Sequence, residues 1–376
     1  MKRFSNIYER IYDMENLKLA HRNARKDKAL YKEVKMVDSN EEYFLWKIQK
    51  LLMEKKYHIC PKDYTVSIIR DKTKNRELRK LKYYPHRIIQ RAIMLQLEKI
   101  FSNNFCNFTC ASVKWRGWKQ IRLLMNKYLN DREWTKYCLK IDISKYYPSV
   151  NHRILKRLLR RKFKDPDLLR LLDMIIDSFP WRKWLPIWSY LSQFLANFYL
   201  SYFDHRLKEK LHCKYVLRYM DDIVILDWSK KHLRYIFRRM KWYLTGNLNL
   251  KVKDNRQIFP TSVRWVDFVG YRYFYDYTLL RKTTALKLKS RYRHLKRKQD
   301  HWMMRNFQER CSINSYNGRL IRCDSRRLHE KYIEPLYPYM LRYYRFRILW
   351  GDMNKKNLSK LKRYRKKILA KKWKKS

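Results

Sequence analysis

The chain has 376 residues, 45% of them hydrophobic, which is enough to bury a sizeable core. Its 91 Lys and Arg residues outnumber its 34 Asp and Glu residues, which gives a formal net charge of +57. So many basic side chains repel one another unless a polyanion neutralises them. Together with an aromatic content of 16%, whose rings can stack on bases, this favours a nucleic-acid-binding protein over a basic protein of the membrane surface.

No segment predicts export, a membrane span or a zinc site. The start, "MKRFSNIYER", lacks the apolar core of a signal peptide. Residues 185–203 carry no charge, but Pro186, Gln193 and Asn197 make a spanning helix costly. The seven cysteines include no CxxC pair, so we expect reduced thiols in a cytoplasmic protein.

In chain order, helices come first and short strands follow. Residues 1–60 predict mostly helix, since "NIYERIYDMENLKLAHRNAR" and "EEYFLWKIQKLLMEK" have apolar residues at helical spacing. "YTVSIIR" predicts a strand, "DKTKNRELRK" a basic turn and "HRIIQRAIMLQLEKIF" a helix. "YCLKIDISKYYPSV" predicts a strand that ends in a turn at Pro148, and residues 152–178 predict helix.

The second half of the chain adds a buried helix and a hairpin. "SYLSQFLANFYLSYFDHRLKEKL" predicts one long helix whose first half is buried. "YVLRY" and "IVILD" predict a β-hairpin, and "KKHLRYIFRRMKWYL" predicts an amphipathic helix. "VDFVGYRYF" predicts a pair of strands, and helices follow from residue 281. This order of elements indicates an α+β fold.

Two adjacent acids, Asp221 and Asp222, lie at the tip of the predicted hairpin. Two carboxylates side by side repel each other unless a cation bridges them, and buried β-branched neighbours increase that cost. Asp142 also follows an apolar strand, 79 residues upstream of Asp221. The usual alternative for an isolated pair of aspartates is a solvated turn. The second strand-borne acid instead favours a site for divalent metal ions that activates a hydroxyl and stabilises a leaving pyrophosphate.

Three segments resemble motifs A, B and C of reverse transcriptases, in that order: "DISKYYPSV", "LPIWSYLSQFLANFYL" and "RYMDDIVIL". "LNLKVKDNRQIFP" resembles the motif after the catalytic hairpin, "VDFVGYRYF" the primer-grip hairpin, and "KNRELRKLKYYPHRIIQRAI" the fingers segment. Residues 1–60 resemble the helical extension of the bacterial, group II intron-like branch.

The resemblance implies a right-hand polymerase with fingers, a palm made of an antiparallel sheet backed by helices, and a helical thumb. We expect the N-terminal helical extension at 1–60 and the fingers at 61–135. The palm is expected at 136–275, with fingers helices inserted at about 152–183, and the basic helical thumb and tail at 276–376. The implied enzyme is a nucleotidyltransferase that performs RNA-directed DNA synthesis.

The catalytic roles of the family carry over to matching positions. Asp142, Asp221 and Asp222 would bind two Mg²⁺ ions, for which Mn²⁺ substitutes, and Ile143 would add its backbone carbonyl. Tyr147 takes the place of the aromatic gate that excludes a ribose 2′-hydroxyl; the alternative, a core tyrosine, suits Tyr146 better. The residues expected at the incoming nucleotide are Lys74, Arg76, Arg87, Tyr147, Ile187, Trp188, Gln193 and Lys253. Arg256 is the alternative to Lys253. For each basic residue of the fingers, the alternative is a solvated surface position without a ligand.

Primer and template contacts are expected from Tyr219, Met220, Trp115, Arg116, Trp118, Phe268, Gly270 and Tyr271. Trp188 stands where the family usually has glycine, and "VKWRGWKQ" replaces a glycine-arginine-glycine loop. A tryptophan ring covers roughly 150–250 Å², so we hypothesise that these rings narrow the template channel and restrict the template or let the protein influence its choice. The alternative is that they pack or stack on RNA.

The pair Ser192 and Gln193 resembles diversity-generating retroelement enzymes and defence-associated bacterial groups. The expected partners are a noncoding or template RNA, deoxynucleotides, the DNA product, and a partner protein or second copy of the chain, with no membrane. The basic segment 355–376 would hold structured RNA. We favour a cytoplasmic, bacterial or phage-encoded antiphage defence enzyme. The alternatives are a diversity-generating retroelement enzyme and a non-catalytic RNA-binding or splicing-helper protein.

Overall fold

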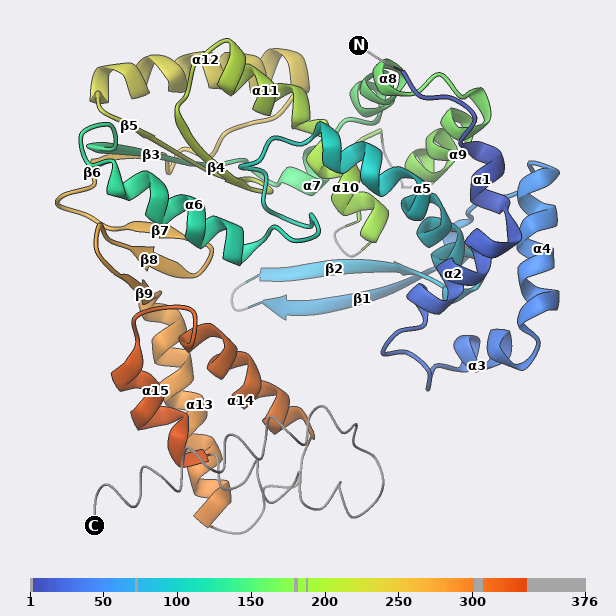
Figure 1. Ribbon diagram of the computed structural model, residues 1–376. Helices are drawn as coiled ribbons and strands as arrows, with labels where there is room; N and C mark the ends of the chain where they lie inside the picture. Colours follow the sequence, from blue (N-terminus) through green and yellow to red (C-terminus); the bar gives the residue numbers. More distant parts are fainter. Residues whose placement is uncertain (1–2, 72–73, 179–181, 187–188, 301–306, 337–376) are drawn as a thin grey trace. The chain divides into compact units, whose positions relative to one another are not determined.

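The computed structural model describes residues 3–71, 74–178, 182–186, 189–300 and 307–336 (Figure 1). The chain forms two compact units, Met1–Arg264 and Trp265–Ser376. This division lies upstream of the palm–thumb boundary expected near residue 275, because the hairpin after Arg264 makes its contacts with the C-terminal helices. The four-part division into extension, fingers, palm and thumb stays a prediction.

Residues 8–53 are mostly helical, as predicted. The helices are α1 (Tyr8–Tyr12), α2 (Met14–Ala24), α3 (Lys32–Ser39) and α4 (Glu41–Met53). Asp13 and Asn40 begin α2 and α4 because their side chains accept hydrogen bonds from the free amides of Asn16 and Tyr43. Helices α1 and α2 pack their apolar faces on α5 (Ile88–Asn104), which is the predicted helix after the fingers segment.

Strands β1 (Tyr64–Asp71) and β2 (Lys74–Leu81) form an antiparallel hairpin, with Tyr64 opposite Leu81. The prediction of a basic turn for "DKTKNRELRK" is wrong for most of its length, since β2 begins at Lys74. The reason is that five of the eight residues of β2 are charged. It carries no alternation of apolar and polar residues, and backbone pairing with β1 defines the strand instead.

Four further helices flank β3 (Tyr137–Asp142) in the chain, the first before it and the other three after it. They are α6 (Trp118–Asn130), α7 (Tyr146–Ser149), α8 (His152–Lys162) and α9 (Pro166–Asp177). The predicted helix at 152–178 is interrupted because the side chain of Asp165 caps α9, accepting the amide of Leu168, and Pro166 begins the new helix. Asp165 also accepts the backbone amides of Ile7 and Tyr8 and so fixes the start of the chain against α9.

The central sheet of the first unit has the strand order β4-β5-β3-β6 and is antiparallel throughout. Its strands are β3 (Tyr137–Asp142), β4 (Tyr215–Tyr219), β5 (Asp222–Asp227) and β6 (Gln257–Pro260). Strands β3 and β5 lie at the centre of the sheet; β5 is buried after Asp222, which explains its apolar run, while β3 buries Cys138, Leu139 and Ile141. The predicted strand and hairpin are therefore confirmed.

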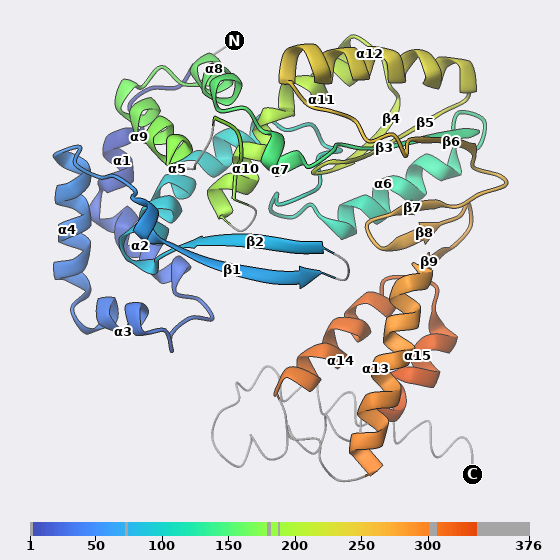
Figure 2. The same cartoon turned by 180° about the vertical axis from the view of Figure 1, so that it is seen from behind.

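Helices cover the sheet. Helix α12 (Lys230–Leu248) packs across β3, β5 and β6 and runs beside the sheet in both views (Figures 1 and 2). Its buried side chains, Leu233, Ile236, Phe237, Met240, Leu244 and Leu248, recur at helical spacing and form the face turned to the strands. The predicted long buried helix is two helices, α10 (Tyr190–Tyr199) and α11 (Ser201–Glu209), which meet at Leu200.

The second unit begins with a three-stranded sheet, β7 (Val266–Phe268), β8 (Tyr271–Tyr273) and β9 (Thr278–Leu280). The predicted strand pair is confirmed, and its turn has positive φ at both Val269 and Gly270, where glycine is favoured. Helices α13 (Lys282–Asp300), α14 (Phe307–Leu320), α15 (Arg326–Tyr332) and the short η3 (Glu334–Leu336) follow. The basic segment 355–376 lies outside the described residues.

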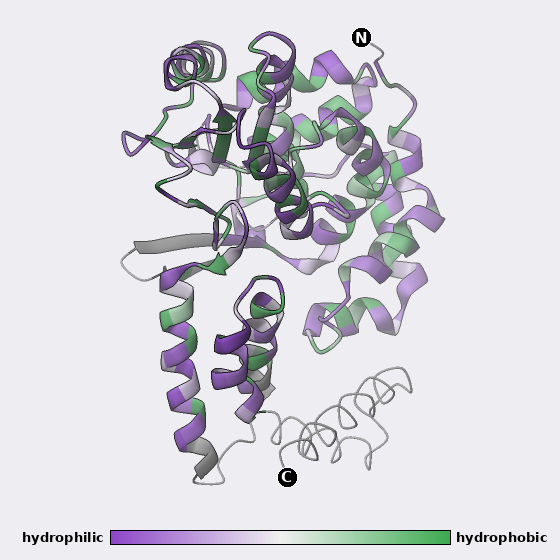
Figure 3. Cartoon of the chain, turned by 60° about the vertical axis from the view of Figure 1, so that its left-hand side comes forward, coloured by the Kyte–Doolittle hydropathy of each residue, from purple (hydrophilic) through white to green (hydrophobic). Residues whose placement is uncertain are grey.

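Hydrophobic residues gather on the strands of the first unit and on the inward sides of its helices, while the outward turns are hydrophilic (Figure 3). None of the helices within the described ranges combines the length and the apolar character needed to cross a bilayer. The uncharged run at 185–203 coincides with α10 and its flanks, a helix that is buried against α5.

Candidate active site

Three aspartates meet at one end of the central sheet. Asp142 is the last residue of β3 and pairs in register with Asp222, the first residue of β5. A two-residue turn, Met220 and Asp221, joins β4 to β5, and Met220 adopts a φ of 54° there. The backbone amide of Ile143 donates to the carbonyl of Asp221 over 3.1 Å, which ties the two strand ends together. The three predicted acids therefore lie on adjacent backbone positions.

Asp221 is costly to ionise in its buried position beside two other acids. The pKa of Asp221 is raised from 3.8 to about 6, chiefly by burial and then by the negative charges of Asp142 and Asp222, while a hydrogen bond to its own backbone amide and the charge of Lys253 lower it. A carboxyl group with this pKa is partly protonated in mildly acidic solution. A bound cation would therefore stabilise the ionised form of Asp221 and reduce the repulsion among the three carboxylates.

One cation of the protein already reaches the site. The Lys253 Nζ atom lies 2.7 Å from Asp142 Oδ1, and the backbone amide of Lys253 donates to the Asp142 carbonyl over 2.9 Å. This contact is an ion pair without hydrogen-bond geometry, so the buried Oδ1 atom accepts no hydrogen bond. Lys253, which was predicted at the triphosphate, thus lies against the carboxylate of Asp142, one of the three predicted acids.

The donor set suits a hard divalent cation. Carboxylate oxygens are the ligands that Mg²⁺ prefers, and a buried carboxylate oxygen without a donor gains from coordination. Within the described ranges, no three His, Cys, Asp or Glu side chains are close enough together to hold a metal ion as they stand. The ion pair between Asp142 and Lys253 accounts for part of this, because the lysine takes a position at the carboxylate that a metal ion would take.

The raised pKa of Asp221 predicts a pH-dependent stability. The folded state holds a proton that the unfolded state releases, so the stabilising contribution is present at low pH and is lost as the pH rises from about 4 through about 6. In metal-free protein at about pH 7, Asp221→Asn should therefore unfold at a higher urea concentration than wild type. The difference should shrink towards about pH 4.

Urea unfolding in EDTA across this pH range measures the effect. Glu133→Gln, an exposed acid before β3, is the control and should track the wild type at every pH. A stability difference between Asp221→Asn and wild type that does not change with pH would contradict the assigned pKa.

The predicted sugar gate lies beside the catalytic turn. The Tyr147 hydroxyl donates to the Sδ atom of Met220 at 3.7 Å, and burial followed by the charge of Asp221 raises its pKa above the usual value. Its neighbour Tyr146 is buried and donates to the carbonyl of Ala196. The two tyrosines therefore divide as expected: Tyr146 packs in the core and Tyr147 lies near the aspartates.

The other predicted contacts are spread over the chain. Lys74 and Arg76 lie in β2, but their side chains, like all of Ile187 and Trp188, lie outside the described residues. Gln193 is in the first turns of α10, half-buried. Phe268, Gly270 and Tyr271 belong to the β7–β8 hairpin of the second unit, where Phe268 and Tyr271 are buried. Tyr219, at the end of β4, is 37% exposed.

The two tryptophans of the loop before α6 differ. Trp115 has a φ of 65° and is 95% exposed, so its ring packs against no part of the described chain. Trp118 is half-buried and begins α6. Arg116 between them donates from Nη1 to the carbonyls of Cys106 and Thr109, at 2.7 and 3.2 Å, so its guanidinium holds the loop in place.

Arg87 lines a basic cavity of about 320 Å³ at the base of the β1–β2 hairpin. Lys28, Arg79 and Arg91 line it as well. The Gln90 side chain is 6% exposed; its Oε1 accepts from Ser189 Oγ at 2.6 Å, while its Nε2 has no partner among the described residues. A buried amide donor without an acceptor, beside several cations, suits an anionic ligand.

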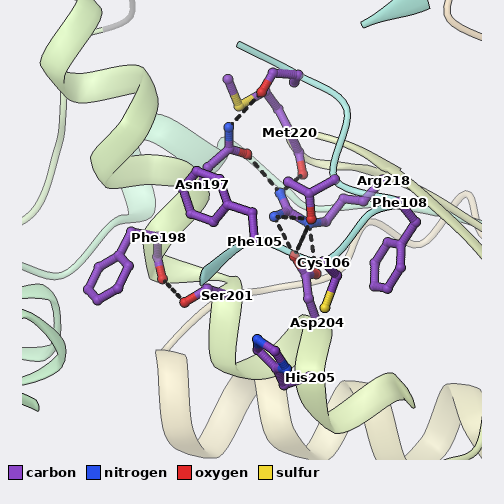
Figure 4. Close-up of polar contacts among 12 residues, drawn as sticks. Phe105, Cys106, Phe108, Asn197, Phe198, Ser201, Asp204, His205, Arg218 and Met220 are labelled. Atoms are coloured by element: carbon purple, nitrogen blue, oxygen red, sulfur yellow. Dashed lines mark hydrogen bonds and ion pairs between the residues drawn. The ribbon is translucent and has the colours of Figure 1, made fainter. Parts of the chain in front are cut away.

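A buried charge network behind the catalytic turn was missed by sequence reasoning (Figure 4). Arg218 in β4 is fully buried; its Nε and Nη2 atoms donate to the carboxylate of Asp204 in α11 at 2.8 and 2.6 Å. Its Nη1 atom donates to the Met220 carbonyl at 3.0 Å and to Asn197 Oδ1 at 3.1 Å. Arg218 therefore fixes the backbone of the turn that carries Asp221. An arginine inside an apolar strand was the available signal.

Comparison with known proteins agrees with this geometry. The sequence profile described as reverse transcriptase (RNA-dependent DNA polymerase) matches residues 27–273, and the chain belongs to this family. It is 28% identical over 151 residues to nuclear intron maturase 4, mitochondrial, of Arabidopsis thaliana, covering 38% of this chain and 18% of that protein. It is 24% identical over 219 residues to the protein YkfC of Escherichia coli, covering 54% of this chain and 50% of that protein.

Similar solved structures include a telomerase from Candida albicans in complex with a fragment of telomeric RNA, with 11% identity and a TM-score of 0.44. That match covers 66% of this chain and 55% of the telomerase chain. The curated relatives are matched over half of their length or less.

Proposed function

We propose that the chain is an RNA-directed DNA polymerase that adds deoxynucleotides to a primer. The observation that carries the proposal is the register of β3 and β5, which brings Asp142 beside Asp222 and the turn residue Asp221 in a chain of the reverse transcriptase family. A protein that only binds RNA gains nothing from three carboxylates placed side by side at the end of a sheet, one of them partly buried.

Two Mg²⁺ ions fit this donor set, with Mn²⁺ as a substitute. Asp142, Asp221 and Asp222 would hold them, together with the backbone carbonyl of Ile143. When bound, the ions lower the pKa of the attacking 3′-hydroxyl and stabilise the leaving pyrophosphate. Lys253 would leave Asp142 and place its ammonium near the phosphates, so that the chain exchanges an internal ion pair for contacts to the substrate.

The direct test is primer extension on an RNA template with purified protein, Mg²⁺ and deoxynucleotides. Extension that follows the template sequence supports the proposal. Binding of primer and template without extension, at any Mg²⁺ or Mn²⁺ concentration, contradicts it.

Tyr147 is proposed to select deoxynucleotides. Its ring lies against Met220 and near Asp221, where a 2′-hydroxyl of the incoming nucleotide would meet it. We expect Tyr147→Ala to raise ribonucleotide incorporation relative to deoxynucleotide incorporation by about 10² or more, since rejection of one hydroxyl by shape is worth a few kcal/mol. Single-nucleotide extension with each sugar measures the ratio.

Tyr147→Phe is the matched control, because it keeps the ring and removes only the hydroxyl. It should discriminate between the sugars as the wild type does. If Tyr147→Ala keeps the wild-type preference for deoxynucleotides, Tyr147 is not the gate.

The basic cavity at the hairpin base supports a path for the template strand through the first unit. Its cations and the free Gln90 amide would contact backbone phosphates. The exposed ring of Trp115 would stack on a base, since it fills no space within the described chain. Whether the tryptophans restrict the template is tested by extension on templates of random sequence; efficient copying of all four bases would exclude restriction.

The biological setting we favour is bacterial antiphage defence with a dedicated noncoding RNA; a diversity-generating retroelement is the alternative. A second class of function, RNA binding in splicing, is favoured by the likeness to a plant intron maturase. Sequencing the RNA and DNA that copurify with the protein separates these settings. A single structured RNA with complementary DNA fits defence, a variable repeat fits a retroelement, and intron RNA without DNA fits splicing.

A further inference from the structure

Three arginines from two helices gather around aromatic rings on the outer side of the first unit. Arg157 and Arg161 are exposed on α8, and Arg206 is on α11. The Arg161 guanidinium lies 5.7 Å from the centre of the Tyr202 ring, and that of Arg206 lies 5.3 Å from Tyr243. We call these three residues the α8–α11 arginine cluster.

The members of the cluster are close to one another. All three guanidinium groups act on the Tyr243 phenol: burial raises its pKa, and Arg206, Arg161 and Arg157 lower it in that order. Arg157 and Arg161 also line, with Tyr202, an open hollow of about 530 Å³. Three like charges close to one ring destabilise the folded protein unless an anion lies near them.

No carboxylate of the described residues pairs with the cluster. The nearby acids are occupied elsewhere, Asp173 by Arg160 and Glu209 by His205. The Nε atom of Arg206 is buried and has no hydrogen-bond acceptor among the described residues. The neighbouring Arg160 is paired with an acid, whereas Arg161 and Arg206 contact aromatic rings. This difference indicates that the cluster binds an external anion.

Helix α12 extends this basic surface. Its outward residues Lys231, Arg234, Arg238, Arg239 and Lys241 are exposed, and the helix contains no acid. Between them lie two exposed rings, Tyr235 at 46% and Trp242 at 60%, and the guanidinium groups of Arg206 and Arg239 lie 5.8 and 5.7 Å from the Trp242 ring. The helix spans about 28 Å, long enough to follow several phosphates of a strand.

This surface is separate from the catalytic aspartates. The apolar face of α12 packs on the sheet, so its basic face points away from the strands that carry Asp142 and Asp222. A membrane is a poor partner because α12 has already buried its apolar face. Duplex DNA would use the cations but not the rings, whereas the unpaired bases of RNA loops stack on exposed aromatic side chains.

We propose that the α8–α11 arginine cluster and the outer face of α12 bind a structured segment of RNA, with phosphates among the arginines and unpaired bases on Trp242 and Tyr235. The surface holds RNA outside the active site and keeps the RNA attached while a different part of it is copied. It goes beyond the proposed polymerase function, because binding here requires no catalysis.

The test compares two triple variants of the full chain. Arg157→Gln/Arg161→Gln/Arg206→Gln removes the cluster. Lys32→Gln/Lys35→Gln/Lys47→Gln removes the same charge from exposed positions of α3 and α4. The probe is an RNA hairpin of about 16 base pairs with an unpaired loop, and the measurement is its Kd between about 50 and 200 mM salt.

We expect the cluster variant to weaken RNA binding at least about tenfold more than the control variant, and to lower the salt slope by about 2 to 3. A third variant, Trp242→Ala, should weaken binding of the looped hairpin but not of a blunt RNA duplex. The rate of extension on a short, saturating primer–template should stay at the wild-type value in the cluster variant.

Equal losses in the cluster and control variants would overturn the proposal. The proposal would also be overturned if a DNA hairpin bound as tightly as the RNA and lost as much affinity in the cluster variant. Displacement of the RNA by anionic phosphatidylserine vesicles would overturn it as well. Urea unfolding checks that each variant folds, since α11 is tied to β4 by the ion pair of Asp204 and Arg218. A further variant with Arg→Lys at the three positions keeps the charge and should restore most of the salt slope. RNA binding that depends on the cluster in a protein without extension activity would refute the polymerase and leave this inference standing.

Discussion

Replacing either Asp221 or Asp222 with asparagine should reduce RNA-templated extension by about 10³-fold or more, because each change removes a charged oxygen ligand from the proposed metal site. The fold should survive. Asp221 is ionised at a cost set by burial and by its two neighbours, so the neutral side chain removes repulsion rather than a bond. Loss of activity without loss of stability is the expected pattern.

Extension rates, urea midpoints and primer–template Kd are measured on the same preparations. Glu133→Gln is the matched control and should keep the wild-type extension rate. Binding of primer and template should change by only a few fold in the aspartate variants, since their role is in the chemical step. An Asp222→Asn protein that extends primers at the wild-type rate would refute the assigned site.

The second large effect is expected at Arg218. Arg218→Met leaves the fully buried Asp204 without its partner, which should lower the free energy of unfolding by about 3–5 kcal/mol. The same change removes the donor that holds the Met220 carbonyl, so the catalytic turn loses its support from behind.

A double variant separates the two roles. Arg218→Met/Asp204→Leu replaces the ion pair with apolar groups, and such replacements are often neutral for stability. We expect the urea midpoint to recover while kcat stays at least about tenfold below wild type and KM for the deoxynucleotide changes little. If kcat recovers together with stability, Arg218 contributes only to folding and does not position the turn.

The central sheet and its three acids were predictable because short sequence segments contain both the strands and the acids. The apolar strands before Asp142 and around Asp221 are short, buried and bounded by turns, and each carries its acid at a strand end. Register then followed from burial, since a slip of one residue would turn every side chain to the opposite face. The different places of Tyr146 and Tyr147 followed instead from the resemblance of "DISKYYPSV" to motif A.

What escaped prediction depends on contacts distant in sequence or on elements without an apolar pattern. Strand β2 has no apolar face and is defined by its partner β1. The Arg218 network joins side chains from a strand and two helices, and only the folded chain shows that Asp204 and Asn197 meet there. Arg116 reads as a surface cation in sequence, yet it holds the carbonyls of its own loop.

Iron-directed cleavage of the chain would test the central claim most directly. Fe²⁺ replaces Mg²⁺ in a carboxylate site, and with ascorbate and peroxide it generates hydroxyl radicals that cut the backbone nearby. Added to the protein with primer–template and deoxynucleotide, Fe²⁺ should cut near Asp142 and near the turn at Met220 and Asp221. Excess Mg²⁺ and the Asp221→Asn substitution should suppress both cuts. Cuts confined to other parts of the chain, or cuts at only one of the two strand ends, would contradict a metal site shared by the three aspartates.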